Sequence, residues 1–174
     1  RDPPRNGWFD IDDCFYNTCG GYAGYYDVSW GYPDSPIVDC GEFPPASDWD
    51  LTARGSCPNP RLEQEGFAGF DDVETISLDS PNPGDRFRLA VHYNGRTGFN
   101  YTPAPTTAHA EVWCDGIPIA ALGPATLDSY LLWSGDLWRV ADIEFDSAGA
   151  SCAVTPVAPL PGYDVQPYET WDTF

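Results

Sequence analysis

Acidic side chains are the residues of this chain best suited to chemistry, and they are densest in one short stretch. Residues 63–74 hold five carboxylates and two glycines within twelve positions. Ca²⁺ is bound by several carboxylate and loop carbonyl oxygens, which such a stretch provides, although the spacing is not that of an EF-hand. We therefore predict a calcium site, with a plain acidic surface loop as the alternative, and its ligands would be Glu63, Glu65, Asp71, Asp72 and Glu74.

Other acids occur in close pairs, as in Asp10-Ile-Asp12-Asp13 and Asp48-Trp-Asp50. A glycosidase needs two carboxylates facing each other across a cleft, and an exposed tryptophan beside an acid can stack on a sugar ring. The alternative function is therefore a carbohydrate-binding module or a carbohydrate-active enzyme. Its stacking residues would be Trp113, Trp133 and Trp138, unless these aromatic side chains simply cover the core.

The two histidines, His92 and His109, are the remaining candidates for catalysis. With Glu111 they could bind zinc, but a catalytic zinc site usually takes three protein ligands within a supporting shell, and no spacing singles out such a set. The chain contains no G-x-S-x-G, H-E-x-x-H or phosphate-binding loop motif. We expect no catalytic residues and predict that the protein is not an enzyme.

Composition restricts both the fold and the partners. The 27 acids face eight arginines and no lysine, so the net charge of −19 would repel nucleic acid and anionic membranes. The apolar runs are too short to insert into a membrane. The chain has 17 glycines and 18 prolines together with 15% aromatic residues, which favours a turn-rich all-β domain over a helical or disordered chain.

Six cysteines without repeated zinc spacing predict three disulfides and hence an oxidising compartment. The chain contains no methionine, so we expect an N-terminal export signal to have been removed before Arg1. The predicted location is extracellular or at the cell surface. The expected partners are other extracellular proteins or further copies of this chain.

Short β-prone runs separated by turn residues fill the second half of the chain and predict an antiparallel β-sandwich. We expect one domain over 1–158, in which a loop region rich in Cys, Tyr and Gly (1–60) precedes the regular strands (61–158). A Pro-rich extended tail follows over 159–174. The predicted strands are 73–78, 87–93, 110–114, 117–122, 137–145 and 152–157.

Alternation within two of these runs predicts which side chains are buried. Residues 87, 89, 91 and 93 would share one buried face, with Arg88, Ala90 and His92 outward, whereas Ala110, Val112 and Cys114 would face inward. If these two strands form a hairpin around the loop 94–108, both histidines lie on one outer face and Arg88 approaches Glu111.

A series of seven motifs over residues 13–157 resembles an uncharacterised secreted β-domain family, related to the YfaP-like domains and common in surface proteins of myxobacteria and their relatives. The resemblance implies an extracellular β-sandwich without established enzymatic activity, and the matching of Glu74 to an acidic position of the family. The motifs are Asp13-Cys14-Phe-Tyr-Asn-Thr-Cys19, Ser47-Asp48-Trp49, Asn59-Pro60-Arg61-Leu62-Glu63, Glu74-Thr-Ile-Ser-Leu-Asp79-Ser-Pro81, Phe87-Arg-Leu-Ala-Val-His92-Tyr93, Val112-Trp-Cys114-Asp-Gly116 and Leu137-Trp138-Arg-Val-Ala-Asp142-Ile143.

The predicted disulfides join Cys14 to Cys19, Cys40 to Cys57 and Cys114 to Cys152. The first closes a short loop that matches the family motif, the last joins two core strands, and the second follows by elimination.

The family also opens with a strand that would precede Trp8, so we expect an unpaired sheet edge that something must cover. It would be covered by an upstream strand of the same chain or by a strand from a neighbouring copy. The Pro-rich arm 156–174 is the candidate donor of the second arrangement, which would make a surface fibre. The predicted function is a secreted, non-catalytic structural or binding module.

Overall fold

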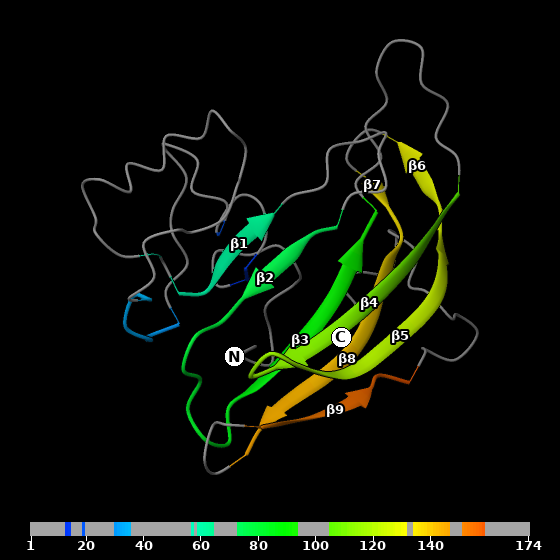
Figure 1. The fold of residues 1–174 in the computed structure, drawn as a ribbon. Helices are drawn as coiled ribbons and strands as arrows, with labels where there is room; N and C mark the ends of the chain where they lie inside the picture. Colours follow the sequence, from blue (N-terminus) through cyan, green and yellow to red (C-terminus); the bar gives the residue numbers. More distant parts are fainter. Residues whose placement is uncertain are drawn as a thin grey trace. The chain divides into compact units, whose positions relative to one another are not determined.

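The computed structural model describes residues 13–14, 19, 30–35, 57, 59–64, 73–93, 105–131, 134–146 and 151–158. Its regular elements are nine short strands that pair only in antiparallel fashion (Figure 1). This confirms the predicted all-β antiparallel fold class. Within these ranges no helix combines the length and the apolar character that crossing a membrane requires.

The chain divides into two compact units, residues 1–81 and 82–174. The division falls some way beyond the change of composition near residue 60. Whether both units form the single domain expected over 1–158 stays a prediction, and the expected tail 159–174 lies outside the described residues.

In the first unit, β1 (Arg61–Gln64) pairs with β2 (Thr75–Ser77), with Leu62 opposite Ile76. A separate bridge joins Ser35 to Cys57 through two backbone hydrogen bonds of 2.8 and 3.2 Å. Leu62 and Cys19 are buried together, and Cys14 and Trp30 pack against them.

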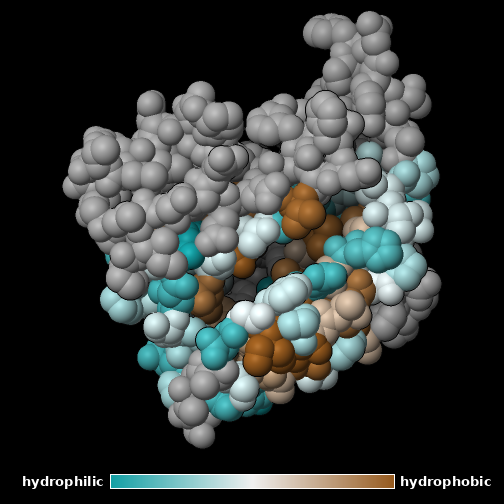
Figure 2. Space-filling model, viewed as in Figure 1, coloured by the Kyte–Doolittle hydropathy of each residue, from teal (hydrophilic) through white to brown (hydrophobic). Residues whose placement is uncertain are grey.

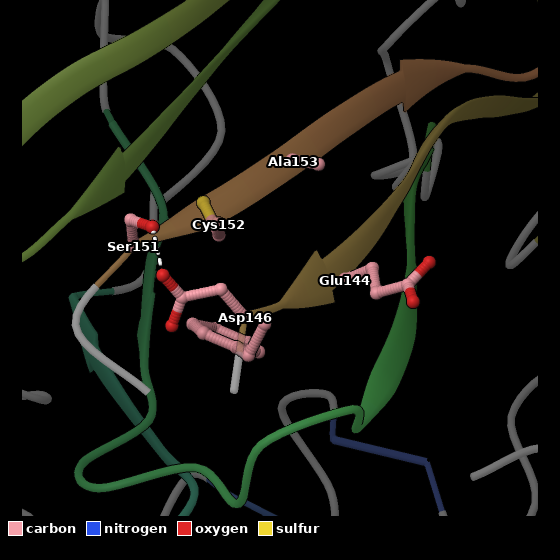
Figure 3. Close-up of a pocket in the computed structure, with 6 residues that line it drawn as sticks. Glu144, Asp146, Ser151, Cys152 and Ala153 are labelled. Atoms are coloured by element: carbon pink, nitrogen blue, oxygen red, sulfur yellow. Dashed lines mark hydrogen bonds between the residues drawn. The ribbon is translucent and has the colours of Figure 1, made fainter. Parts of the chain in front are cut away.

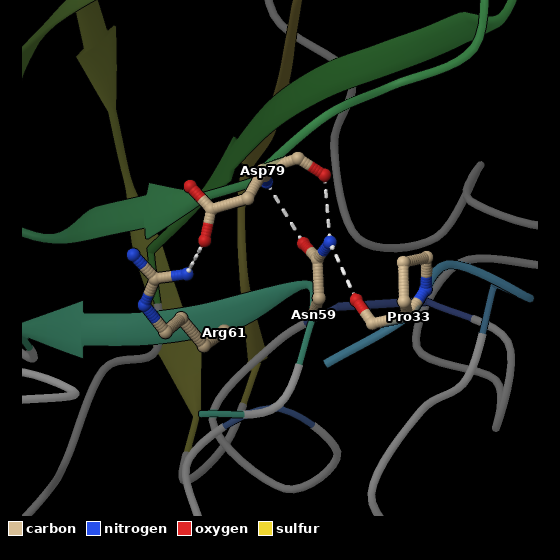
Figure 4. A network of polar contacts seen from close by, with 4 residues as sticks. All are labelled: Pro33, Asn59, Arg61 and Asp79. Atoms are coloured by element: carbon tan, nitrogen blue, oxygen red, sulfur yellow. Dashed lines mark hydrogen bonds and ion pairs between the residues drawn. The ribbon is translucent and has the colours of Figure 1, made fainter. Parts of the chain in front are cut away.

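Buried polar groups fix the first unit (Figure 4). The Asn59 amide nitrogen donates to the carbonyls of Pro33 (3.2 Å) and Asp79 (2.6 Å), while its oxygen accepts the Asp79 N–H (2.9 Å). The Arg61 guanidinium, 3% exposed, donates to the Asp79 carboxylate at 2.5 Å. Three separate segments are thus tied together by Asn59 and Asp79, because buried backbone groups need partners.

The second unit contains the longer strands. β3 (Arg86–His92), β8 (Leu137–Phe145) and β9 (Cys152–Pro156) form a sheet in the order β3-β8-β9. β4 (Thr106–Cys114) and β5 (Ile117–Leu127) form a hairpin, and β6 (Ser129–Leu131) pairs with β7 (Ser134–Gly135).

The hairpin and the three-stranded sheet form two layers, because β5 contacts both β8 and β9 (Figure 1). Their buried side chains make an apolar core that includes Val112, Leu127, Leu137 and Val140. At one end of the three-stranded sheet, where β3 begins and β8 ends, the rings of Phe87 and Phe145 meet edge to face, with centroids 6.0 Å apart. The layering is that of a small sandwich.

All six predicted strands are present, as β2, β3, β4, β5, β8 and β9. The strands β1, β6 and β7 were not predicted. β1 has the sequence Arg-Leu-Glu-Gln, and β7 is only two residues long, so neither shows apolar alternation. Short strands of this kind depend on tertiary partners more than on their own sequence pattern.

The predicted hairpin between 87–93 and 109–114 is wrong. β3 pairs with β8, and β4 pairs with β5 through a two-residue turn, with Cys114 opposite Ile117. The turn residues Asp115 and Gly116 have φ of 52° and 72°, the left-handed conformation of a type I′ turn. Asp-Gly is a strong signal for this turn, and it closes a hairpin more easily than a long loop does.

In the observed pairing, the two histidines are on different strands of different sheets, and Arg88 has another partner. His92 lies on β3 and His109 on β4, in different sheets, and Arg88 pairs with Asp142 rather than approaching Glu111. The predicted alternation holds along β3 as far as Leu89 and fails beyond it, where Ala90 and His92 are half-buried. At this point the register shifts, because Val140 of β8 has no partner on β3. The alternation predicted for β4 is confirmed.

Two of the predicted disulfides are confirmed, Cys14–Cys19 and Cys114–Cys152, with Cα separations of 5.2 and 6.1 Å. Cys57 is also in a disulfide, while Cys40, its predicted partner, lies outside the described residues. The Cys114–Cys152 bond joins β4 of the hairpin to β9 of the other sheet, so it links the two layers covalently.

Candidate binding surface

The outer face of β4 presents a row of exposed side chains. Val112 and Cys114, at the end of this strand, are buried. Every second residue of β4 points outward, because successive side chains of a strand alternate between its two faces. The outward row contains a threonine, a histidine, an acid and an indole: Thr107, His109, Glu111 and Trp113.

Trp113 is the largest side chain of this row and is 57% exposed. Its indole Nε1 donates a hydrogen bond to Glu111 Oε2 at 3.0 Å. This bond uses the nitrogen edge of the ring, so the exposed area lies on the faces and the other edges of the indole. The second carboxylate oxygen of Glu111 takes no part in the bond.

The residues of β5 that lie opposite Glu111 and Trp113 have small or flat side chains. Pro118 lies opposite Trp113, and Ala121 lies opposite Glu111. At Gly123, φ is +104° and an added Cβ would lie 2.9 Å from the carbonyl oxygen of Ala108. The same Cβ would lie 3.1 Å from the Trp138 ring of β8, so Gly123 faces the second sheet. The low apolar shelf beside the row on β4 is formed by Pro118 and Ala121.

The turn end of the hairpin adds exposed aliphatic side chains. Ile117 is 60% exposed and Ile119 is 41% exposed. Figure 2 shows hydrophobic residues gathered over β4 and β5 near the turn that joins them. A contiguous exposed apolar patch of this kind marks an interaction site more often than scattered apolar residues do. We call the exposed side chains at this end of the hairpin, Glu111, Trp113, Ile117, Pro118, Ile119 and Ala121, the hairpin patch.

The outer face of the other sheet carries ion pairs instead. Arg88 binds both carboxylate oxygens of Asp142, at 2.7 and 2.9 Å, and Arg86 pairs with Glu144 at 2.6 Å. The hydrogen bond from Arg88 lowers the pKa of Asp142, whereas burial, together with the charge of Arg88, lowers the pKa of Arg139. These are cross-strand pairs that stabilise a sheet, and their charges are already compensated.

A hollow of about 260 Å³ lies where β8 turns into β9 (Figure 3). The Ser151 hydroxyl donates to the Asp146 carboxylate, and the Asp146 N–H donates to the Ser151 carbonyl at 3.1 Å. Glu144 projects away from this pair and binds Arg86. The hydrogen bonds close the connection between the strands, which is a structural role.

The histidines differ in environment. Burial lowers the pKa of His92 to about 4, so this imidazole is neutral at pH 7. His109 is exposed on the outer face of β4. Because they stand on different sheets, the two do not form the joint site considered from the sequence.

Of the five predicted calcium ligands, Glu63 and Glu74 are among the described residues. Glu65, Asp71 and Asp72 lie outside the described residues, and only the backbone of Glu63 is described, in β1. Glu74 is exposed just before β2, and nearby protein atoms nonetheless raise the pKa of its carboxyl by desolvation. Among described residues no group of three His, Cys, Asp or Glu could hold a metal ion. The calcium site stays a prediction.

Two of the three predicted stacking residues are among the described residues, and they differ in exposure. Trp113 is exposed, and Trp133 lies outside the described residues. Trp138 is half-buried, and its ring carbon Cη2 would be 3.1 Å from a Cβ at Gly123, so its indole packs against β5. Ile117 and Ile119 were not singled out, because a continuous apolar run resembles a buried strand. The Asp-Gly turn beside them is a sequence signal that these residues lie near the tip of a hairpin.

No protein-family model, curated protein or solved structure matches the chain. The resemblance to the secreted β-domain family therefore stays a prediction. What the hairpin patch can bind is therefore inferred from the geometry of its side chains.

Proposed function

We propose that this chain is a non-catalytic binding module that works outside the cytoplasm, at the cell surface or in the extracellular space. The observation that carries the proposal is the hairpin patch, an exposed apolar surface on a hairpin that a disulfide links to the second sheet. A rigid scaffold with an exposed aromatic anchor suits recognition, because little side-chain order is lost on binding.

The cysteines support the compartment. Cys14, Cys19, Cys57, Cys114 and Cys152 all take part in disulfides, which persist mainly in oxidising compartments. The net charge of −19 further favours partners that are neutral or basic over nucleic acid and anionic membranes.

The acidic stretch 63–74 extends the proposal to stabilisation by calcium, through its carboxylates. Binding to the folded chain alone would raise its melting temperature by mass action. Equal melting curves in millimolar calcium and in chelator would remove this part of the proposal and leave the rest. Self-assembly into a fibre is tested separately by sizing the intact chain in solution, where a monomer would contradict it.

The location is tested in the source cells with antibody against the intact chain. We expect labelling of unpermeabilised cells or of the medium, and cysteines that resist alkylation until a reductant is added. A chain found only inside permeabilised cells, with thiols that alkylate directly, would contradict the proposal.

A further inference from the structure

We propose that the hairpin patch binds a neutral glycan, with one pyranose ring stacked on Trp113 and a hydroxyl of that sugar hydrogen-bonded to Glu111. This inference rests on the proposed function, because it names the ligand of the same surface.

The first argument is that folding does not require the exposed apolar groups of the hairpin patch. The same two strands bury Val112, Cys114 and Leu127 on their inner side, and these side chains complete the core. Trp113 exposes more than half of its surface on the other side. Exposed apolar surface of this extent has a free-energy cost in water that a bound ligand would remove.

The second argument is the geometry of the indole and the carboxylate. An aromatic face is electronegative, and the axial C–H groups on one side of a pyranose are weakly positive, so the two attract. A sugar lying on the ring directs its equatorial hydroxyls past the ring edge. Glu111 stands at that edge, held by the 3.0 Å bond from Trp113, and its other oxygen can accept a hydroxyl hydrogen.

The third argument is the shape beside the ring. Pro118 and Ala121, opposite the indole and the carboxylate, leave a shallow apolar shelf along β5. His109 lies four residues before Trp113 in the same outward row, a distance of about 14 Å at strand spacing. The row is therefore long enough for an oligosaccharide, and a few polar groups placed along an apolar surface are typical of ligand sites.

The negative charge of the chain favours neutral glycans over anionic ones. A chain with net charge −19 and a carboxylate at the stacking position would repel uronic acids and sulfated sugars, and it would repel a second copy of itself. A stable protein partner would need about 800 Å² of surface on each side. The hairpin patch comprises six residues at one end of one hairpin, which suits a small ligand better.

The test uses the full chain with its disulfides intact, titrated calorimetrically with cellohexaose, xylohexaose and mannohexaose. Hexagalacturonate and hexa-arginine serve as the anionic and cationic probes. We expect at least one neutral hexaose to bind and hexagalacturonate not to bind. Trp113→Ala should weaken that binding at least tenfold, Trp113→Tyr should keep it within about threefold because stacking survives, and Glu111→Ala should weaken it several-fold.

Ile76→Ala is the matched control, because Ile76 is 46% exposed on β2, a strand of the first unit. It should bind the hexaose as the wild-type chain does. Each variant is checked by its melting curve, and if Trp113→Ala does not fold, Trp113→Gln and Glu111→Ala carry the test.

The glycan proposal is overturned if no neutral hexaose binds at millimolar concentration, or if binding persists in Trp113→Ala. It is also overturned if hexa-arginine is the only probe bound, since the partner would then be a basic protein. None of these outcomes changes where the chain is found, so they leave the proposed location standing. Conversely, release of shorter sugars from a bound hexaose would support the site and contradict the non-catalytic function.

Discussion

The two units of this chain are stabilised in different ways. The first joins strands of four and three residues and buries Asn59 and Arg61, whose polar atoms bind Asp79 and backbone carbonyls. The second joins strands of up to eleven residues over an apolar core and links its layers through Cys114–Cys152. A polar framework depends on a few exact partners, whereas an apolar core distributes its stability over many contacts.

The two disulfides offer the largest contrast. Cys114 and Cys152 are 38 residues apart in sequence and Cys14 and Cys19 only five, so the first restricts the unfolded chain more. Replacing Cys114 and Cys152 by serine should lower the free energy of unfolding by about 4 kcal/mol, and replacing Cys14 and Cys19 by about 2 kcal/mol. Urea denaturation of the two double variants measures this, and equal losses would contradict the chain-entropy argument.

Asn59→Ala should destabilise the first unit by about 1 to 3 kcal/mol, because it leaves three partly buried backbone groups without their partner. The matched control is Asn82→Ala, at an exposed position, which should change stability by at most about 0.5 kcal/mol. Denaturant unfolding followed by circular dichroism compares the two. A loss at Asn59 as small as that at Asn82 would show that the polar network is not what holds this unit.

His92 should make the second unit sensitive to mild acid. Its folded pKa of about 4 is below the ordinary value of 6.5, so the unfolded chain takes up the proton first as the pH falls. Stability is therefore full above pH 6.5 and declines towards pH 4, by up to about 3 kcal/mol. His92→Phe should remove this slope and His109→Gln should keep it. A slope that survives in His92→Phe would contradict the assignment.

Arg88→Gln should have the smallest effect, because the Arg88 and Asp142 side chains are 35% and 46% exposed. The loss of stability should be at most about 1 kcal/mol. The clearer signal is the pKa of Asp142, which Arg88 holds below its ordinary value and which should rise in the variant. A titration of the Asp142 side chain followed by NMR measures the change, and an unaltered pKa would show that another group lowers it.

The contrast between the units also explains what the sequence could predict. β-prone runs between turn residues located β3, β4 and β8. Alternation correctly placed Trp113 outward on β4, because half-buried strands carry a period of two. Alternation failed along β3 beyond Leu89, where Val140 of β8 has no partner and the register shifts, and bulges leave no such periodic signal. In the first unit, β1 depends on hydrogen bonds between Asn59 and distant backbone groups, which no local pattern encodes.

For the candidate site, the sequence could identify Trp113 as a stacking residue but not the side chains that surround it. The Asp115-Gly116 turn is a sequence signal for the hairpin between β4 and β5, and it is stronger than the signal for a pairing across the loop 94–108. The exposure of Ile117 and Ile119 could not be foreseen, because burial depends on which face of the hairpin meets the second sheet. The separation of Trp113 from Trp138 likewise depends on that packing.

The most direct test of the central claim, that the hairpin patch serves binding rather than folding, compares two tryptophans by denaturant unfolding. Trp113 is largely exposed, while Trp138 packs against β5 at Gly123. Trp113→Ala should lower the free energy of unfolding by no more than about 1 kcal/mol, and Trp138→Ala by about 3 kcal/mol. Equal losses in the two variants would contradict the claim, because Trp113 would then be part of the core.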